Sequence, residues 1–136
     1  MSPSLTAVLL YAAWTLLLLS AIAALRAYHT LDGRPANAFA VGGDDVSAFS
    51  GRLCRAHANC YENLPAFAAI LFAAMLAGRS DITDPLALWL VAARAAQSTV
   101  HLWSTSVPAV IFRFACLAPQ ITIQVWWLAQ LLGATR

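Results

Sequence analysis

Apolar residues gather in four long stretches of the chain, and shorter polar segments separate these stretches. Each stretch is close to the ~20 residues that a helix needs to cross a bilayer. The pattern predicts helices at 4–29, 48–78, 82–104 and 107–133. The second and third connections are short, so neighbouring helices should run antiparallel. We therefore expect an all-α fold, an integral membrane four-helix bundle with a single domain over residues 1–136.

The composition also indicates a lipid bilayer as the surroundings of this chain. Hydrophobic residues make up 61% of it and charged residues only 10%, and the mean hydropathy is +0.71. A soluble domain of this composition would lack the polar surface that keeps a protein dispersed. The net charge of +2 includes no long basic run, so we expect no nucleic-acid partner. The three cysteines lack CxxC spacing, which argues against a zinc site or a disulfide framework.

A row of polar residues follows one face of the second predicted helix. Arg52, Arg55, Asn59 and Glu62 are three, four and three residues apart, which stacks them on one helix face. Charged groups inside a membrane helix are costly and mark functional sites. The arginines suit carboxylates, the amide both donates and accepts, and the glutamate would receive an ammonium group or another arginine. The row therefore either binds a small polyionic ligand or bonds only to neighbouring helices or subunits.

The third predicted helix has a second polar face, formed by Arg94, Gln97 and His101. Counted in helical rise from the turn at 78–84, Glu62 and Arg94 lie at comparable heights. Because an unpaired arginine at that depth costs several kcal/mol, our hypothesis is a buried ion pair between them. Pro65 removes one backbone hydrogen bond from the second helix, so a bend just below Glu62 is expected.

The segment between the first two helices is the one long polar connection that the pattern predicts. Arg26, Arg34 and Arg52 flank it, whereas Arg79 and Arg136 lie at the opposite end of the predicted bundle. Cytoplasmic segments of membrane proteins carry an excess of positive charge. This rule places the long first loop in the cytoplasm and gives a multi-pass membrane protein.

A family resemblance follows from two of these segments. The run from Arg55 to Glu62, Arg-Ala-His-Ala-Asn-Cys-Tyr-Glu, is followed by Pro65 and resembles the signature of the MAPEG family. These are the membrane-associated proteins of eicosanoid and glutathione metabolism. The segment 93–108 resembles the third helix of that family and the turn after it, with Arg94 and Pro108 on its arginine and proline. The resemblance covers essentially the whole chain as a single MAPEG-like transmembrane domain.

The resemblance implies a homotrimer that binds glutathione between adjacent subunits near the cytoplasmic surface. By position, Arg55, Asn59 and Glu62 would contact glutathione or shape its site, and Arg94 would pair with Glu62. The predicted binding set is Arg52, Arg55, Asn59, Glu62, Arg94, Gln97 and His101. Glutathione carries two carboxylates, one ammonium group and a thiol, so its charges complement the polar row.

The segment around Pro108 departs from the catalytic members of the family. Those members place an arginine close to this proline, where it stabilises the thiolate, but here hydroxyl residues precede Pro108 and apolar residues follow it. A thiol with a pKa of about 8.5 is mostly protonated at neutral pH, so a cation or a donor must stabilise its thiolate. The candidate catalytic residues are Arg113 and Ser106.

Two classes of function remain open on this reading. The first is a glutathione-dependent membrane transferase or peroxidase, acting on hydrophobic electrophiles or lipid hydroperoxides. The second is a non-catalytic protein of the MAPEG fold that binds lipid or acts as a scaffold. No internal repeat or pair of broken helices favours a transporter.

Overall fold

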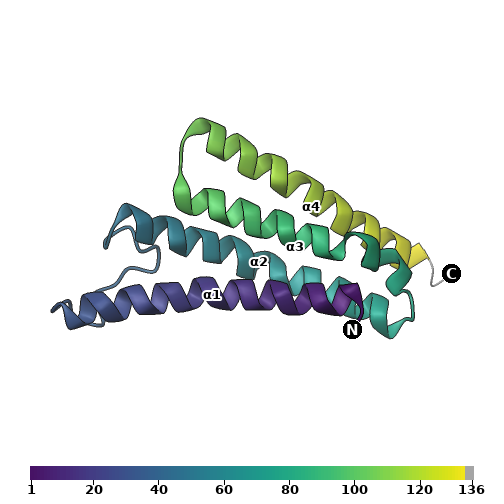
Figure 1. Ribbon diagram of the computed structural model, residues 1–136, viewed down its shortest axis with the longest axis horizontal. Helices are drawn as coiled ribbons and strands as arrows, with labels where there is room; N and C mark the ends of the chain where they lie inside the picture. The colour runs from purple at the N-terminus through teal and green to yellow at the C-terminus, as the bar shows by residue number, and fades with distance from the viewer. Residues whose placement is uncertain (134–136) are drawn as a thin grey trace.

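The computed structural model describes residues 1–133, which form four α-helices and, within that range, no strand. These are α1 (Pro3–Leu31), α2 (Ala48–Leu76), α3 (Ser80–Trp103) and α4 (Val107–Gly133) (Figure 1). The prediction of an all-α four-helix fold is confirmed. Each helix begins and ends within two residues of its predicted bounds.

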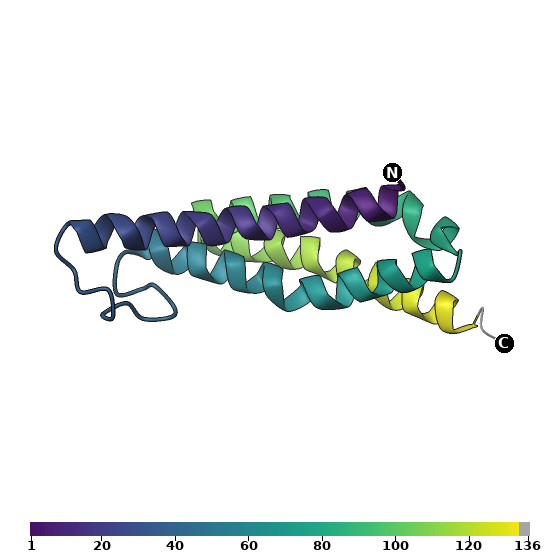
Figure 2. The same cartoon turned by 90° about the horizontal axis from the view of Figure 1, so that it is seen from below.

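The helices form a long antiparallel bundle whose two ends differ in structure. The long loop of residues 32–47 and the α3–α4 connection lie at one end, called here the loop end (Figure 1). The N-terminus and the short α2–α3 turn lie at the other, the turn end (Figures 1 and 2). α3 packs against all three other helices, and α2 packs mainly against α1 and α3. Within the described residues α1 and α4 do not pack against each other, so α2 and α3 together form the centre of the bundle.

Local sequence signals explain where the helices begin and end. The side-chain oxygens of Ser2 and Ser47 accept backbone hydrogen bonds from Leu5 (3.2 Å) and Ser50 (3.0 Å), which caps α1 and α2. Gly78 follows α2 with a φ of 67°, a left-handed conformation that glycine adopts without a steric penalty. These caps satisfy backbone groups that helix ends would otherwise leave unpaired.

The core combines branched aliphatic side chains with aromatic rings and small residues. Tyr11 of α1 lies 5.1 Å from Phe67 of α2, and Phe67 lies 6.4 Å from Trp127 of α4, measured between ring centroids. All three side chains are fully buried. Ala56 and Ala87 are also fully buried, and small residues of this kind let helix backbones approach closely in a membrane protein.

Two prolines lie inside helices. α2 continues through Pro65, and the ribbon of α2 changes direction near its middle (Figure 2), which agrees with the bend predicted there. Pro119 lies inside α4 in the same way and removes one backbone bond from that helix. The sequence analysis did not single out Pro119.

The helices differ in how well they suit a membrane. Among residues 1–133, α1 and α4 are the two helices whose length and apolar composition alone suit a bilayer crossing. α2 and α3 fall outside that set because they carry the two polar faces. The outer surface of α1 exposes a series of leucines, Leu9, Leu10, Leu16, Leu17 and Leu19. An apolar surface of this kind is suited to contact with lipid.

We predict that Phe67→Ala lowers the free energy of unfolding in detergent by about 2–3 kcal/mol, because the cavity removes packing contacts that count in lipid as well as in water. The matched control is Phe72→Ala, which makes the same change on α2 at a half-exposed position. Phe72→Ala should lower the free energy of unfolding by less than about 0.5 kcal/mol. Equal losses in thermal or denaturant melts of the two variants would contradict this account of the core.

Candidate functional site

A chain of three hollows runs along α2 on the side that faces α3 and α4. The middle hollow, about 440 Å³, has Arg55, Asn59, Gln97, His101, Thr105 and Arg113 in its walls, with apolar side chains of α4. The outer hollow, of about 170 Å³, adjoins it toward the loop end and shares Arg55 and Thr105 with it. The inner hollow, of about 210 Å³, lies on the other side of the middle hollow and shares Asn59 and Gln97 with it. We call the three together the polar groove.

The polar groove brings together most of the predicted site residues. Eight of the nine line at least one of its hollows: Arg52, Arg55, Asn59, Glu62, Arg94, Gln97, His101 and Arg113. These residues come from three helices, and the most distant of them are about 60 residues apart in the sequence. The packing of the helices brings them together.

Ser106 is the predicted residue that the fold does not bring to the groove. It is exposed in the α3–α4 connection, where its N–H donates to the Ser104 hydroxyl oxygen (3.1 Å) and its own hydroxyl oxygen accepts from Ser104 (3.0 Å). Thr105, which the sequence analysis missed, lines two of the hollows instead. Three hydroxyl residues precede Val107, and their spacing alone did not indicate which of them faces inward.

Three arginines surround the outer part of the groove. Arg52 donates from Nε to the carbonyl oxygen of Leu102 (2.8 Å), which anchors it at the negative end of α3. Arg55 has one loose ionic contact, 3.7 Å from its Nη2 to Oδ2 of Asp44. Arg113 forms no ion pair within residues 1–133. Two of the three guanidinium groups are therefore available to an anionic ligand.

Buried amide and imidazole groups form the floor of the groove. Gln97 and His101 of α3 are 6% and 8% exposed. Nδ2 of Asn59 lies 3.5 Å from Nδ1 of His101, and Nε2 of Gln120 donates to Oε1 of Gln97 (3.3 Å). Because this bond occupies the Gln97 oxygen, the Gln97 amide nitrogen is the group left to donate to a ligand.

Arg94 is the most deeply buried charge at the inner end of the groove. It is 2% exposed, donates from Nη1 to the carbonyl oxygen of Asn59 (3.3 Å), and lies 5.9 Å from the ring centroid of Tyr11. Its Nε and Nη2 have no hydrogen-bond partner among the described residues. A buried guanidinium with free donors is costly, and here it borders a hollow that a ligand or water can enter.

The hypothesis of a Glu62–Arg94 ion pair is wrong for this structure. Within residues 1–133 no ion pair joins them, and Glu62 is exposed. Both side chains line the inner hollow, so comparing their heights along the two helices correctly placed them in one region. The difference is rotational, because Arg94 turns inward to the Asn59 carbonyl and Tyr11 while Glu62 points outward.

The long loop is held in place by its own charged residues. Arg34 forms an ion pair with Asp45 and lies 4.8 Å from the ring centroid of Phe39. The backbone N–H of Ala40 donates to the Asp45 carboxylate (3.1 Å), and this bond is the main reason why the pKa of Asp45 is lowered. The loop therefore has a defined conformation next to the mouth of the groove.

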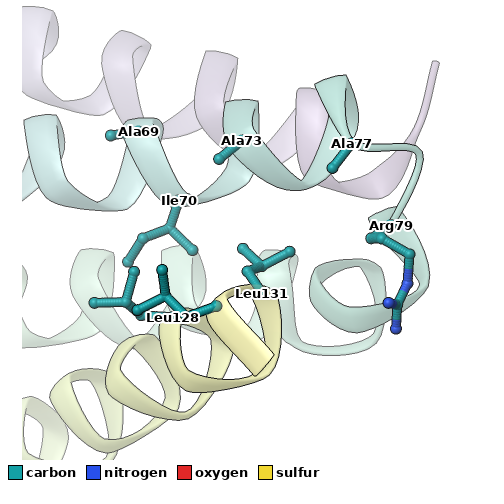
Figure 3. A pocket seen from close by; sticks show the side chains of 8 residues that line it. Ala69, Ile70, Ala73, Ala77, Arg79, Leu128 and Leu131 are labelled. Carbon is teal, nitrogen blue, oxygen red and sulfur yellow. The ribbon is translucent and has the colours of Figure 1, made fainter. Parts of the chain in front are cut away.

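A hollow larger than any of the three in the polar groove lies at the turn end and is apolar. It measures about 630 Å³ and lies between α2 and α4, where Ile70, Leu128 and Leu131 face one another and a row of alanines follows α2 (Figure 3). Arg79 stands at its outer end. This hollow has no carboxylate, imidazole or thiol group in its walls, so it is not a candidate site for thiol chemistry.

We predict that Glu62→Gln leaves the ligand-free melting profile unchanged within about 0.5 kcal/mol, because within residues 1–133 no ion pair joins this carboxylate to a cation. The melt should be followed in detergent beside that of Phe67→Ala, for which we expect a clear loss of stability. A loss of more than about 2 kcal/mol would mean that Glu62 is buried against a cation in the assembled protein.

Comparison with known proteins agrees with the geometry of the site. The model of the MAPEG family matches residues 4–133, nearly the whole chain. Searches of curated proteins and of solved structures found no match. The matched range includes the polar faces of α2 and α3 and the start of α4, which together line the groove. This chain belongs to the MAPEG family.

Proposed function

We propose that this protein is a glutathione-dependent membrane transferase or peroxidase that acts on hydrophobic electrophiles or lipid hydroperoxides. One observation carries the proposal: polar and cationic side chains from α2, α3 and α4 meet around a single hollow of about 440 Å³. That volume lies within the range of small-molecule sites. MAPEG proteins commonly use glutathione, and the family includes transferases and peroxidases.

The charges of the groove match those of glutathione. Arg55 and Arg113 can form ion pairs with its carboxylates or its thiolate, and Glu62 at the inner end can form an ion pair with its ammonium group. Gln97 and Asn59 offer neutral hydrogen bonds to its two peptide groups. The apolar side of the groove, Val110, Phe114 and Leu117 of α4, is suited to a hydrophobic second substrate that arrives from the lipid.

Arg113 is the residue that we propose for thiol activation. It lies in the second turn of α4 and lines the same hollow as Arg55 and His101. A guanidinium beside the sulfur favours the thiolate, which is the nucleophile. In conjugation, the sulfur forms a bond to an electrophilic carbon and a leaving group departs. In peroxide reduction, two glutathione molecules become one disulfide while the hydroperoxide becomes an alcohol and water.

We further propose that all four helices cross the bilayer, with the long loop in the cytoplasm, and that three copies assemble. Arg55 and Glu62 are exposed on α2 in the single chain. Charges at such positions are costly when they face lipid. Neighbouring subunits of a homotrimer would cover these residues and close the open side of the groove.

A non-catalytic lipid-binding or scaffold protein is the second candidate. One observation favours it, because the first cation on α4 is Arg113, five residues after Pro108, and none stands beside the proline. Catalytic members are expected to have their activating arginine close to that proline. If Arg113 does not reach the sulfur, glutathione would bind without efficient turnover.

We predict that Arg55→Ala and Glu62→Gln each weaken glutathione binding by about tenfold or more, since each removes a charge-assisted contact. Isothermal titration of the purified oligomer in detergent measures this. Arg79→Ala removes the same charge as Arg55→Ala at the turn end, outside the polar groove, and should leave the affinity unchanged. Equal affinities in all four proteins would remove the groove as the binding site.

We predict that Arg113→Ala lowers turnover of a generic electrophile by about 100-fold, while the glutathione affinity changes by less than about threefold. The reason is that a cation beside the sulfur acts mainly on the thiolate and the transition state. The ultraviolet absorbance of the bound thiolate, which should fall in the variant, is a second readout. Binding by the parent without turnover would support the non-catalytic alternative instead.

A further inference from the structure

One carboxylate stands among the cations at the mouth of the polar groove. Asp44 of the long loop lines the outer hollow together with Arg52, Arg55 and Thr105. Its Oδ2 is 3.7 Å from Nη2 of Arg55, which is an ionic contact but longer than a hydrogen bond. The two side chains are 65% and 66% exposed. A pair this open and this long is weak, so a ligand can separate it.

The fold, and not this weak pair, determines where Asp44 lies. Gly43 has a φ of 72°, and a Cβ there would lie 2.7 Å from Ser50 Oγ and 2.8 Å from Cys54 Sγ. The loop therefore packs directly on the first turns of α2. The Asp44 carboxylate lies so close to Gly51 that a Cβ at that position would collide with it. These two glycines bring the carboxylate against the helix beside Arg55.

We propose that Asp44 is a built-in competitor for anionic ligands at the mouth of the groove. A ligand carboxylate that binds Arg55 must take the place of Asp44 and then remain close to its negative charge. Both effects lower the affinity for anions, and they do so most for ligands that have no second anchor. A peptide with further contacts at Arg113 and along the groove can still bind. Asp44 thus determines specificity, in favour of anions with several anchoring groups.

This inference rests on the proposed function and is tested by a gain in affinity. Asp44→Asn removes the charge and keeps the size of the side chain. We expect it to bind glutathione about three- to tenfold more tightly in titrations of the full-length oligomer. A misfolded variant would bind more weakly, so this result would not arise from damage to the fold.

Two controls separate the local effect from a general change of charge. Asp32→Asn makes the same substitution in an exposed residue just after α1 that lines none of the three hollows of the polar groove, and it should leave the affinity unchanged. Glutathione diethyl ester, which has no free carboxylate, should bind the parent and Asp44→Asn equally.

The outcomes distinguish this inference from the proposed function. If the parent binds glutathione and Asp44→Asn binds it equally or more weakly, the inference is wrong while the proposed function stands. Weaker binding would show that Asp44 receives the ammonium group of the ligand. If neither protein binds glutathione, the proposed function and this inference both fall.

Discussion

Polar side chains inside an apolar bundle have to find partners, and this requirement governs the arrangement of α2 and α3. Arg94 is the strongest case, because it is a permanent charge that the fold buries almost completely. It contacts the backbone of α2 at Asn59 and lies over the Tyr11 ring of α1, and the Tyr11 hydroxyl donates to the Cys60 carbonyl (3.3 Å). Three helices are therefore oriented around one guanidinium.

The same requirement explains why the functional groups share one groove. The polar faces of α2 and α3 cannot turn toward lipid without a large cost, and together with the start of α4 they line one groove. The apolar halves of α2 and α4 meet at the turn end, where the hollow is lined by alanine, isoleucine and leucine. The polar groove thus lies toward the loop end, and the apolar hollow lies toward the turn end. This separation would suit the proposed reaction of a water-soluble thiol with a hydrophobic substrate.

The sequence predicted the helices and most of the site because both depend on local periodicity. Steps of three and four residues placed Arg55, Asn59 and Glu62 on one face, and the fold kept them along one groove. Periodicity gives the height of a residue and its face on its own helix, but not the rotation of that helix against its neighbour. The prediction of a Glu62–Arg94 ion pair was wrong for this reason.

Features that depend on irregular backbone were not predictable in the same way. The choice of Thr105 over Ser106 depends on the conformation of a three-residue connection, which periodicity does not describe. The position of Asp44 depends on the left-handed Gly43 and on close packing against Gly51. Such contacts follow from the folded loop, and the loop composition alone indicates only that a turn is present.

The proposed function requires a glutathione molecule to lie in the groove between α2, α3 and α4. The most direct measurement is an experimental structure of the oligomer in lipid with glutathione bound. We expect the tripeptide beside Arg55 and Gln97, with its sulfur facing Arg113. A structure in which the neighbouring subunit fills the groove, and glutathione lies elsewhere or is absent at saturating concentration, would contradict it.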